Sequence, residues 1–233
     1  MFIIMAMRSI WRTLDRRLAR DIALVCLADG VVAVSYGAIS VGGGLAWWVP
    51  VLLSVVVFAG ASQFLFVGIV AAGGSPIAAT VAGLLVNTRH VAFGLAVSDA
   101  VGTGWRRWLG SHVMTDENVA FAIGQDDPRR RRAAYWACGV GIFVCWNLGV
   151  LIGAAAGSVI TDTDAFGLDA AFPAVLLALV LPALRDRSTR TAVLVGVVIA
   201  LATTPFLPAG VPVLCALLGL AFYRSPKLVE ATR

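Results

Sequence analysis

Three polar side chains, Asn87, Arg89 and His90, lie within four residues of one another in the otherwise apolar stretch GLLVNTRHVAFGLAV, residues 83–97. On an unbroken helix Asn87 and His90 share one narrow face with glycines on either side, and Arg89 turns away from that face. Either the helix is interrupted here or Arg89 reaches a separate partner. We interpret the cluster as part of a pathway for a polar solute or a proton.

Arginine at the centre of a membrane helix is unfavourable by about 2.5–3.5 kcal/mol on insertion scales, so Arg89 needs an anion nearby. A substrate carboxylate would serve, and a purely structural ion pair is the alternative. The chain's own candidates are Asp29, Asp116, Glu117 and Asp169. The two adjacent carboxylates also suit the first turn of a helix capped by Thr115, and Asp169 also suits an interfacial position.

A second unusual stretch is FAGASQF, residues 58–64, in the middle of a long apolar run. Gly60 and Ser62 keep the backbone slim, and the Gln63 amide adds two donors and an acceptor. This combination predicts a helix break or a close helix crossing. A remote alternative is an intramembrane serine hydrolase with Ser62 as nucleophile and His90 as base, although Arg89 would oppose protonation of that base.

Membrane helices must position these side chains. Of the 233 residues, 60% are hydrophobic and 13% are charged, with a mean hydropathy of +0.90. Soluble domains have about 45–50% apolar and about 25% charged residues, so we expect an all-α, polytopic transmembrane helical bundle. We predict six to eight spans with broken helices, because prolines and glycines interrupt the apolar runs. The main runs are 22–44, 46–72, 76–98, 133–158, 167–184, 190–205 and 208–223.

The positive charges divide the chain into a membrane part and two basic ends. Lys and Arg cluster at or beside the ends of the runs and only Arg89 lies in the interior of one, which favours cytoplasmic termini and argues against nucleic-acid binding. We predict a basic N-terminal segment over 1–21, a transporter domain over 22–223 and a cytoplasmic tail over 224–233. Three spans from a cytoplasmic N-terminus would leave residue 99 outside, whereas the arginines at 129–132 indicate a cytoplasmic position. Either 110–124 therefore crosses as a broken polar helix or one earlier run is re-entrant.

Other motifs predict packing and no cofactor. The four cysteines lie in apolar stretches without a CxxC pair, so we expect reduced core thiols and neither a disulfide nor a metal site. Phosphate-binding loops, HExxH and dinucleotide fingerprints are absent from the sequence, so we predict no ATP-driven step and no enzyme. Gly149, Gly153 and Gly157 form a GxxxGxxxG ladder that predicts a close helix crossing.

Six ordered motifs over roughly 22–223 together resemble the azaleucine-resistance family, AzlC. They are VFAGASQFLFVGIVAAG, LLVNTRHVAFGLAVS, VMTDENVAFA, CWNLGVLIGAAAG, FGLDAAFPAVLLALV and LPAGVPVLCALLGL. The chain departs from the family in its first run, where Tyr36–Gly37 keeps an aromatic–glycine pair but Val31 stands where the family tends to carry proline.

The resemblance implies export of branched-chain and other hydrophobic amino acids (Leu, Ile, Val and often Met) driven by the proton-motive force. It also implies a small, separately encoded AzlD-like membrane subunit. An uptake permease or channel and a non-transporting partner subunit are the rival interpretations.

A zwitterionic substrate assigns roles to the polar residues under this resemblance. The carboxylate would be bound by Arg89 or by the broken backbone at Gly60 and Ser62, and the ammonium by Gln63, Asn87 or an acidic residue. His90 is the first candidate for proton coupling, because imidazole changes charge near neutral pH. The alternative proton carriers, where burial favours the protonated acid, are Asp116, Glu117 and Asp169.

Overall fold

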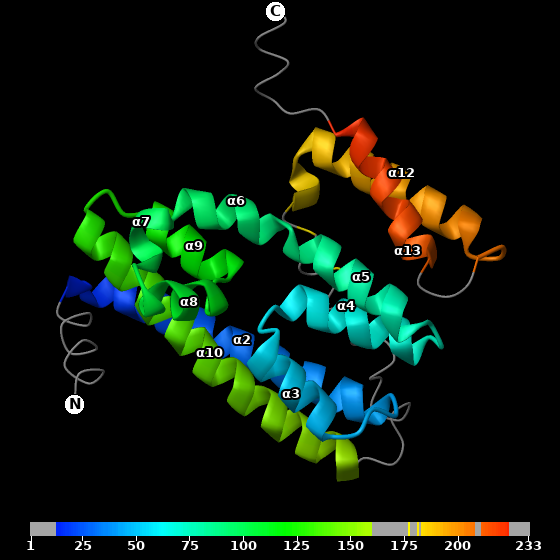
Figure 1. The fold of residues 1–233 in the computed structure, drawn as a ribbon, viewed down its shortest axis with the longest axis horizontal. Coiled ribbons are helices and arrows are strands. Elements are labelled where there is room, and N and C mark those ends of the chain that lie inside the picture. Colours follow the sequence, from blue (N-terminus) through cyan, green and yellow to red (C-terminus); the bar gives the residue numbers. More distant parts are fainter. Residues whose placement is uncertain (1–12, 160–176, 178–180, 182, 208–210, 224–233) are drawn as a thin grey trace, which may run out of the picture. The chain divides into compact units, whose positions relative to one another are not determined.

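The structure is a computed structural model that describes residues 13–159, 177, 181, 183–207 and 211–223 (Figure 1). Every regular element in these ranges is helical, which confirms the all-helical part of the predicted fold; the number of crossings stays a prediction. The chain forms two compact units, Met1–Gln63 with Val86–Phe166, and Phe64–Leu85 with Gly167–Arg233. Asp169, residues 1–12, the tail at 224–233 and most of the run at 167–184 lie outside the described residues.

Two long helices of the first unit, α2 (Arg16–Gly42) and α10 (Pro128–Val159), dominate its architecture. They are the two described helices that are long and apolar enough to cross a membrane. At about 1.5 Å per residue each exceeds the ~30 Å hydrocarbon core of a bilayer. Because α2 begins at Arg16, the last basic residues of the predicted N-terminal segment continue directly into this helix.

The glycine ladder of α10 packs against α2, as the sequence predicts. A Cβ on Gly149, Gly153 or Gly157 would overlap a backbone carbonyl oxygen of α2 in each case, and a Cβ on Gly37 would in turn overlap the carbonyl oxygen of Val150. The two backbones therefore lie in direct contact along this crossing, and larger side chains would force them apart.

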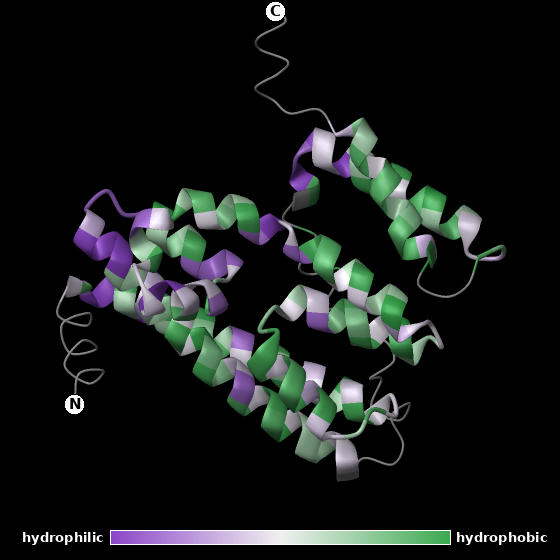
Figure 2. Ribbon diagram, viewed as in Figure 1, coloured by the Kyte–Doolittle hydropathy of each residue, from purple (hydrophilic) through white to green (hydrophobic). Residues whose placement is uncertain are grey.

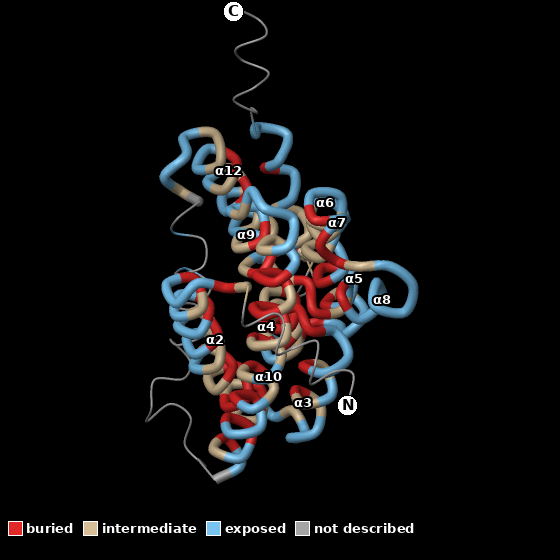
Figure 3. Tube along the Cα trace, turned by 90° about the vertical axis from the view of Figure 1, so that its left-hand side faces the viewer, coloured by how far each residue is buried: buried red, intermediate tan, exposed pale blue. Residues whose placement is uncertain are grey.

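The outward faces of both long helices are apolar. Figure 3 shows buried residues lining one side of α2 and α10 and exposed residues lining the other. Val31 is 70% exposed on α2 and Ile152 is 60% exposed on α10. In Figure 2 the hydrophilic residues of this unit gather mainly at the end where α10 begins. Large apolar side chains facing outward are typical of helices solvated by lipid.

Two apolar runs that the sequence treats as possible spans are interrupted helices. The run at 46–72 forms α3 (Trp48–Val56) and α4 (Gly60–Ala71), and the run at 76–98 forms α5 (Pro76–Asn87) and α6 (Arg89–Ala96). None of the four exceeds about 18 Å at 1.5 Å per residue, so none crosses a bilayer alone. The prediction of broken helices is thereby confirmed.

The stretch that follows forms three short helices, α7 (Ser98–Val101), α8 (Trp105–His112) and α9 (Asp116–Ile123). The helix α9 starts with a capping box in which Thr115 and Asn118 exchange hydrogen bonds. No single helix between 98 and 124 is long enough to cross a bilayer, and the stretch 110–124 is divided between α8 and α9; whether it crosses as a broken polar helix stays a prediction. The core of this region contains Val97, Ala100, Val101, Met114, Val119, Ala122 and Tyr135.

The second unit is smaller. It contains most of α4 and α5 together with η2 (Ala183–Arg185), α12 (Arg187–Thr203), α13 (Val211–Cys215) and η3 (Ala216–Phe222). Ile69, Ala79 and Ala82 form a small core here, with Leu214 packed against it. A second close crossing joins α12 to η3, where the backbone at Gly219 contacts that of Gly196.

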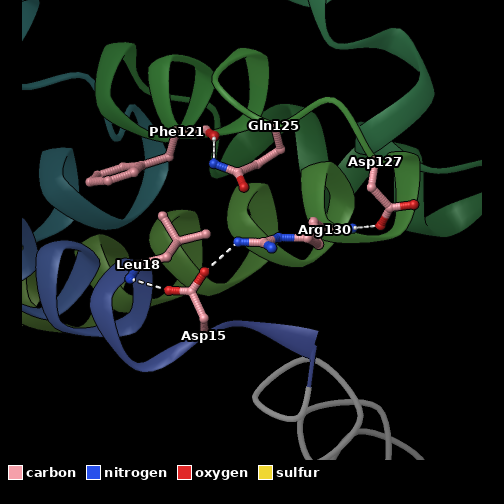
Figure 4. Close-up of polar contacts among 6 residues, drawn as sticks. All are labelled: Asp15, Leu18, Phe121, Gln125, Asp127 and Arg130. Carbon is pink, nitrogen blue, oxygen red and sulfur yellow. Dashed lines mark hydrogen bonds and ion pairs between the residues drawn. The ribbon is translucent and has the colours of Figure 1, made fainter.

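One ion pair ties the N-terminal ends of the two long helices together (Figure 4). Asp15 accepts a hydrogen bond from the backbone N–H of Leu18 at 2.8 Å, which caps α2, and its second oxygen accepts from the Arg130 guanidinium. Asp127 accepts from the backbone N–H of Arg130 at 2.8 Å and so caps α10. The Leu18 hydrogen bond and then the Arg130 bond lower the pKa of the Asp15 carboxyl.

Two further arginines of α10 bind the chain where α6 ends. Arg131 lies 3.5 Å from the Asp99 carboxylate and also donates to the Ala96 carbonyl oxygen. Arg132 donates to the Asp99 carbonyl oxygen at 3.1 Å. These contacts place cationic groups on carbonyls at and just beyond the C-terminal end of α6, which the helix dipole favours.

Candidate functional site

The first helix break, at residues 57–59, reverses the chain. Phe58 is a buried, non-glycine residue with φ of 34°, a conformation that costs of order 1–3 kcal/mol and persists only where packing imposes it. Its ring packs edge-on against Phe143 of α10 at a centroid distance of 5.0 Å. The Gln63 side chain donates to the carbonyl oxygen of Leu53, ten residues earlier, at 3.0 Å. This contact brings the first turn of α4 against the last turn of α3; whether the run is re-entrant stays a prediction.

Gln63 stabilises this break through both ends of its side-chain amide. Its amide nitrogen donates to Leu53, and its amide oxygen accepts the indole N–H of Trp146 at 3.0 Å. The Trp146 ring is stacked on Tyr36 of α2 at a centroid distance of 6.2 Å. Gly60 lies so close to Trp146 that a Cβ would approach its ring to 2.8 Å. Both hydrogen-bonding ends of Gln63 are therefore occupied by the protein.

The second break is a one-residue interruption at Thr88 between α5 and α6, where the φ of −57° and ψ of −24° stay in the helical region. The sequence left open an interruption or a separate partner for Arg89, and both are present. Asn87 ends α5, and its carbonyl oxygen is 3.0 Å from Nδ1 of His90. A carbonyl oxygen only accepts, so Nδ1 of His90 carries a hydrogen. The Asn87 side-chain oxygen Oδ1 is buried and has no hydrogen-bond partner among the described residues.

Residues of both breaks line one cavity of about 230 Å³ within the first unit. The lining residues are Val57, Phe58, Ala59, Asn87, His90, Ser111, His112 and Met114. Both histidines of the chain are among them. The cavity thus combines an apolar wall with an amide, a hydroxyl and two imidazoles, a mixture typical of sites for small amphipathic ligands.

His112 at the end of α8 binds the first break. Its Nε2 lies 2.8 Å from the carbonyl oxygen of Val55, in the last turn of α3, so Nε2 carries a hydrogen. The His112 ring packs against Phe58 and Phe143, at centroid distances of 6.2 Å and 5.8 Å. The sequence analysis did not select His112. Its rarity, as one of two histidines in an apolar chain, was the available signal.

Arg89 binds Asp116 on α9, with an N–O distance of 3.3 Å. Asp116 was one of the anions predicted for it. The two side chains are 34% and 47% exposed, and neither residue lines the cavity. A half-exposed pair of this kind contributes about 0–1 kcal/mol. The ion pair joins α6 to α9 immediately beside the second break.

The remaining predicted residues lie outside the cavity lining. The Ser62 hydroxyl donates to the Ala59 carbonyl oxygen at 2.9 Å, and the described structure shows no hydrogen bond between Ser62 and a histidine. Glu117 is half-buried in the first turn of α9. Asp29 is half-buried on α2, and its Oδ2 lacks a partner in the described part of the chain. The structure therefore brings together Asn87 and His90 from the predicted set.

Comparisons with known proteins agree with the motifs. The family model described as AzlC protein matches residues 24–160. The chain is 30% identical over 161 residues to the inner membrane protein YgaZ of Escherichia coli strain K12, covering 66% of this chain and 62% of that protein.

Two other relatives are described as uncharacterized membrane proteins. One, from Archaeoglobus fulgidus, is 28% identical over 169 residues, 72% of this chain and 74% of its own. One from Helicobacter pylori strain 26695 is 24% identical over 173 residues, 73% of this chain and 75% of its own. No solved structure matches. Because the family match takes in more than half of the chain, including both helix breaks and the cavity, this protein belongs to the AzlC family of membrane proteins.

Proposed function

We propose that this chain exports branched-chain and other hydrophobic amino acids across a bacterial inner membrane, and that the solute binds in the cavity between the two helix breaks. AzlC is a family of transporters, and YgaZ is a relative in an inner membrane. The observation that carries the proposal is that residues of two separate breaks line one cavity together with both histidines.

The geometry of the breaks supports a transport site. Irregular backbone is tolerated at membrane depth only where protein covers it or where it lines a cavity. Transporters use such interruptions to direct free backbone groups and helix ends at a solute near the midplane. Here the helix ends at Val57 and Asn87 both reach the cavity. Its volume lies below the ~300–1,000 Å³ of sites for drug-sized ligands, which suits one small metabolite.

The lining offers complementary surfaces to a hydrophobic amino acid. Val57, Phe58 and Met114 provide an apolar surface for a branched side chain. Asn87 remains the expected partner of the ammonium, and His90 the expected proton carrier through which the proton-motive force acts. Direct solute contacts by Gly60, Ser62, Gln63 and Arg89, and proton coupling by Asp116, Glu117 and Asp169, stay predictions.

The proposed transporter is one part of a two-subunit system. A small AzlD-like membrane protein is the expected partner, and the termini of this chain are expected on the cytoplasmic side. Co-purification of this chain with the product of a neighbouring gene for a small membrane protein tests the partner. Failure of the two to associate in membranes would remove this part of the proposal.

Transport is tested by counterflow of labelled leucine and methionine in proteoliposomes, with and without an imposed pH gradient. We expect leucine exchange that the gradient accelerates. The variant Asn87→Ala should lose most of this exchange, whereas Gln125→Ala, an amide outside the cavity, should retain it. Wild-type exchange by Asn87→Ala would contradict the assigned site. Accumulation of leucine in right-side-out vesicles would support the uptake alternative.

A further inference from the structure

The helix α8 presents tryptophans and arginines to the outside. Trp105 is 63% exposed, Trp108 82% and Leu109 49%, and their spacing of three and four residues places them on one face. Arg106 and Arg107, between the two tryptophans in the sequence, are also exposed. The helix therefore carries a broad apolar surface and two cations on its uncovered sides.

Backbone contacts hold α8 against the first unit by its remaining side. Gly110 is buried, and a Cβ there would come within 2.6 Å of the Val101 carbonyl oxygen and 3.1 Å of the Trp136 ring. The Gly110 carbonyl oxygen accepts the Tyr135 hydroxyl at 2.7 Å. The helix cannot rotate about its axis without breaking these contacts, so its tryptophans and arginines stay on the outside.

The position of α8 along α10 places it at one boundary of the bilayer. The arginines at the start of α10 end with Arg132, and an apolar run follows them. Shortly before α8, the Asp99 carbonyl oxygen accepts from Arg132 and the Ala100 carbonyl oxygen accepts the Trp136 indole N–H, both at 3.1 Å. Tryptophan is enriched at the boundary between lipid and water, where positive residues also gather. The helix α8 thus has the composition and the place of an interfacial helix.

The two arginines of α8 lack an anion within the described part of the chain. No carboxylate there lies within ion-pair distance of either, and the nearby carboxylates of Asp99 and Asp116 are bound by other arginines. The Arg106 guanidinium lies 5.8 Å from the centroid of the Trp105 ring. This stacking leaves its N–H groups at the edge of the guanidinium plane, where they can bind a phosphate through two parallel hydrogen bonds.

We propose that α8 binds the headgroup of an anionic phospholipid, with its phosphate on Arg106 and Arg107 and its upper acyl chains against Trp105 and Trp108. This inference does not depend on the solute that the cavity binds. Further exposed arginines at the starts of α2 and α10 strengthen the positive potential at this end of the unit; they are Arg16, Arg17, Arg20 and Arg129. The positive potential favours a lipid with net negative charge over a zwitterionic lipid that carries the same phosphate.

A lipid satisfies both parts of the α8 surface. A soluble anion would bind the arginines but leave two indole rings in water. An apolar partner would cover the rings but leave the arginines without an anion. A phospholipid supplies a phosphate and an apolar chain within one molecule, in the order in which the boundary of the bilayer presents them.

The test measures which lipid touches α8. The purified full chain is reconstituted in phosphatidylcholine vesicles that contain a minor fraction of phosphatidylglycerol, with brominated acyl chains on one lipid or the other at equal mole fraction. Bromine quenches tryptophan fluorescence on contact. Because the chain has seven tryptophans, the α8 signal is the difference between each protein and the same protein carrying Trp105→Phe and Trp108→Phe.

We expect brominated phosphatidylglycerol to quench the α8 signal more strongly than brominated phosphatidylcholine, and added salt to reduce the difference. Arg106→Gln combined with Arg107→Gln should lower the preference for the anionic lipid by up to about thirtyfold at low ionic strength. Lysine at both positions should retain most of the preference, because the charge remains. The matched control Arg187→Gln with Arg190→Gln removes two exposed arginines from α12 and should leave the α8 signal unchanged.

Four results would overturn the inference. They are equal quenching by the two brominated lipids, an unchanged preference in the double glutamine variant of α8, an equal loss in the α12 control, and displacement of the anionic lipid by millimolar glycerol 1-phosphate, which would indicate a site for soluble anions. Circular dichroism checks that each variant is folded before quenching is compared. None of these measurements involves leucine, so failure here would leave the proposed export untouched, and failure of export would leave this site standing.

Discussion

The two hydrogen bonds of the Gln63 side chain give the sharpest stability prediction. In the variant Gln63→Leu the Trp146 indole N–H loses its acceptor, and the Leu53 carbonyl loses one of its donors. Gln63 is only 1% exposed, so water cannot replace either bond without opening the core. The break between α3 and α4 should be destabilised.

The expected magnitude follows from the two bonds. Removing the Gln63 acceptor from the buried indole of Trp146 costs about 1–3 kcal/mol. The Leu53 carbonyl still accepts from the backbone N–H of Val57 at 2.9 Å, so its loss is smaller, about 0.5–1.5 kcal/mol. The sum of about 1.5–4.5 kcal/mol corresponds to a fall in Tm of roughly 3–18 °C for a chain of this length.

Thermal unfolding in detergent, followed by tryptophan fluorescence and by leucine protection, measures this fall. Gln125→Leu, in which a partly exposed amide loses a weak 3.4 Å bond, is the matched control and should shift Tm little. In the double variant Trp146→Phe/Gln63→Leu, the loss in free energy of unfolding should be smaller than the sum of the two single losses. The difference should be at least about 1 kcal/mol. If Gln63→Leu melts with the wild type yet loses leucine binding, Gln63 contacts the solute and the reasoning fails.

Three other substitutions test separate features. Gly153→Ala should abolish or strongly reduce the folded yield, because a Cβ there would separate α2 from α10. The control Gly94→Ala, with only Met114 nearby at 3.9 Å, should melt within a few degrees of the wild type. Equal folded yields for the two variants would refute the close crossing. Asp116→Asn should change the free energy of unfolding by less than about 1 kcal/mol, because its ion pair is half-exposed, and a larger loss in a denaturant titration would show a buried role. The pKa of the Asp15 carboxyl is lowered from 3.8, so the stability that its ionised form adds to the fold is complete above that value and is lost as pH falls through the lower folded pKa. Asp15→Asn should therefore flatten the fall of Tm with decreasing pH. An unchanged fall would contradict this assignment.

Features with a local chemical cause were predictable from the sequence. The slim GASQ segment marked the first break, the NTRH cluster marked the second, and the glycine spacing marked the crossing of α2 and α10. The unfavourable energy of an arginine in hydrocarbon required an anion, and Asp116 is the anion present. For the two breaks the signal lies within about two helical turns of the feature that it predicts.

Contacts between distant segments were not predictable in this way. His112 binds a carbonyl 57 residues earlier, and Trp146 binds Gln63 across 83 residues. Neither residue has a neighbour in the sequence that demands such a partner. The Val55 carbonyl is available because α3 ends beside it, and the packing of α8 places His112 there. The Gln63 side-chain oxygen meets the Trp146 indole because α10 packs beside the same break. Sequence reasoning finds the break but not the groups that complete it.

The arginines at the start of α10 have a practical consequence for engineering the orientation of this protein. Lys and Arg beside membrane helices are commonly treated as interchangeable topology signals, because both favour the cytoplasmic side. Here the forked guanidinium of Arg131 spans a carboxylate and a carbonyl together, a geometry that a single ammonium cannot reproduce. Replacing these arginines by lysines would leave the insertion signal intact and yet detach the end of α6, so the correctly inserted chain would be loosened beside its own solute cavity.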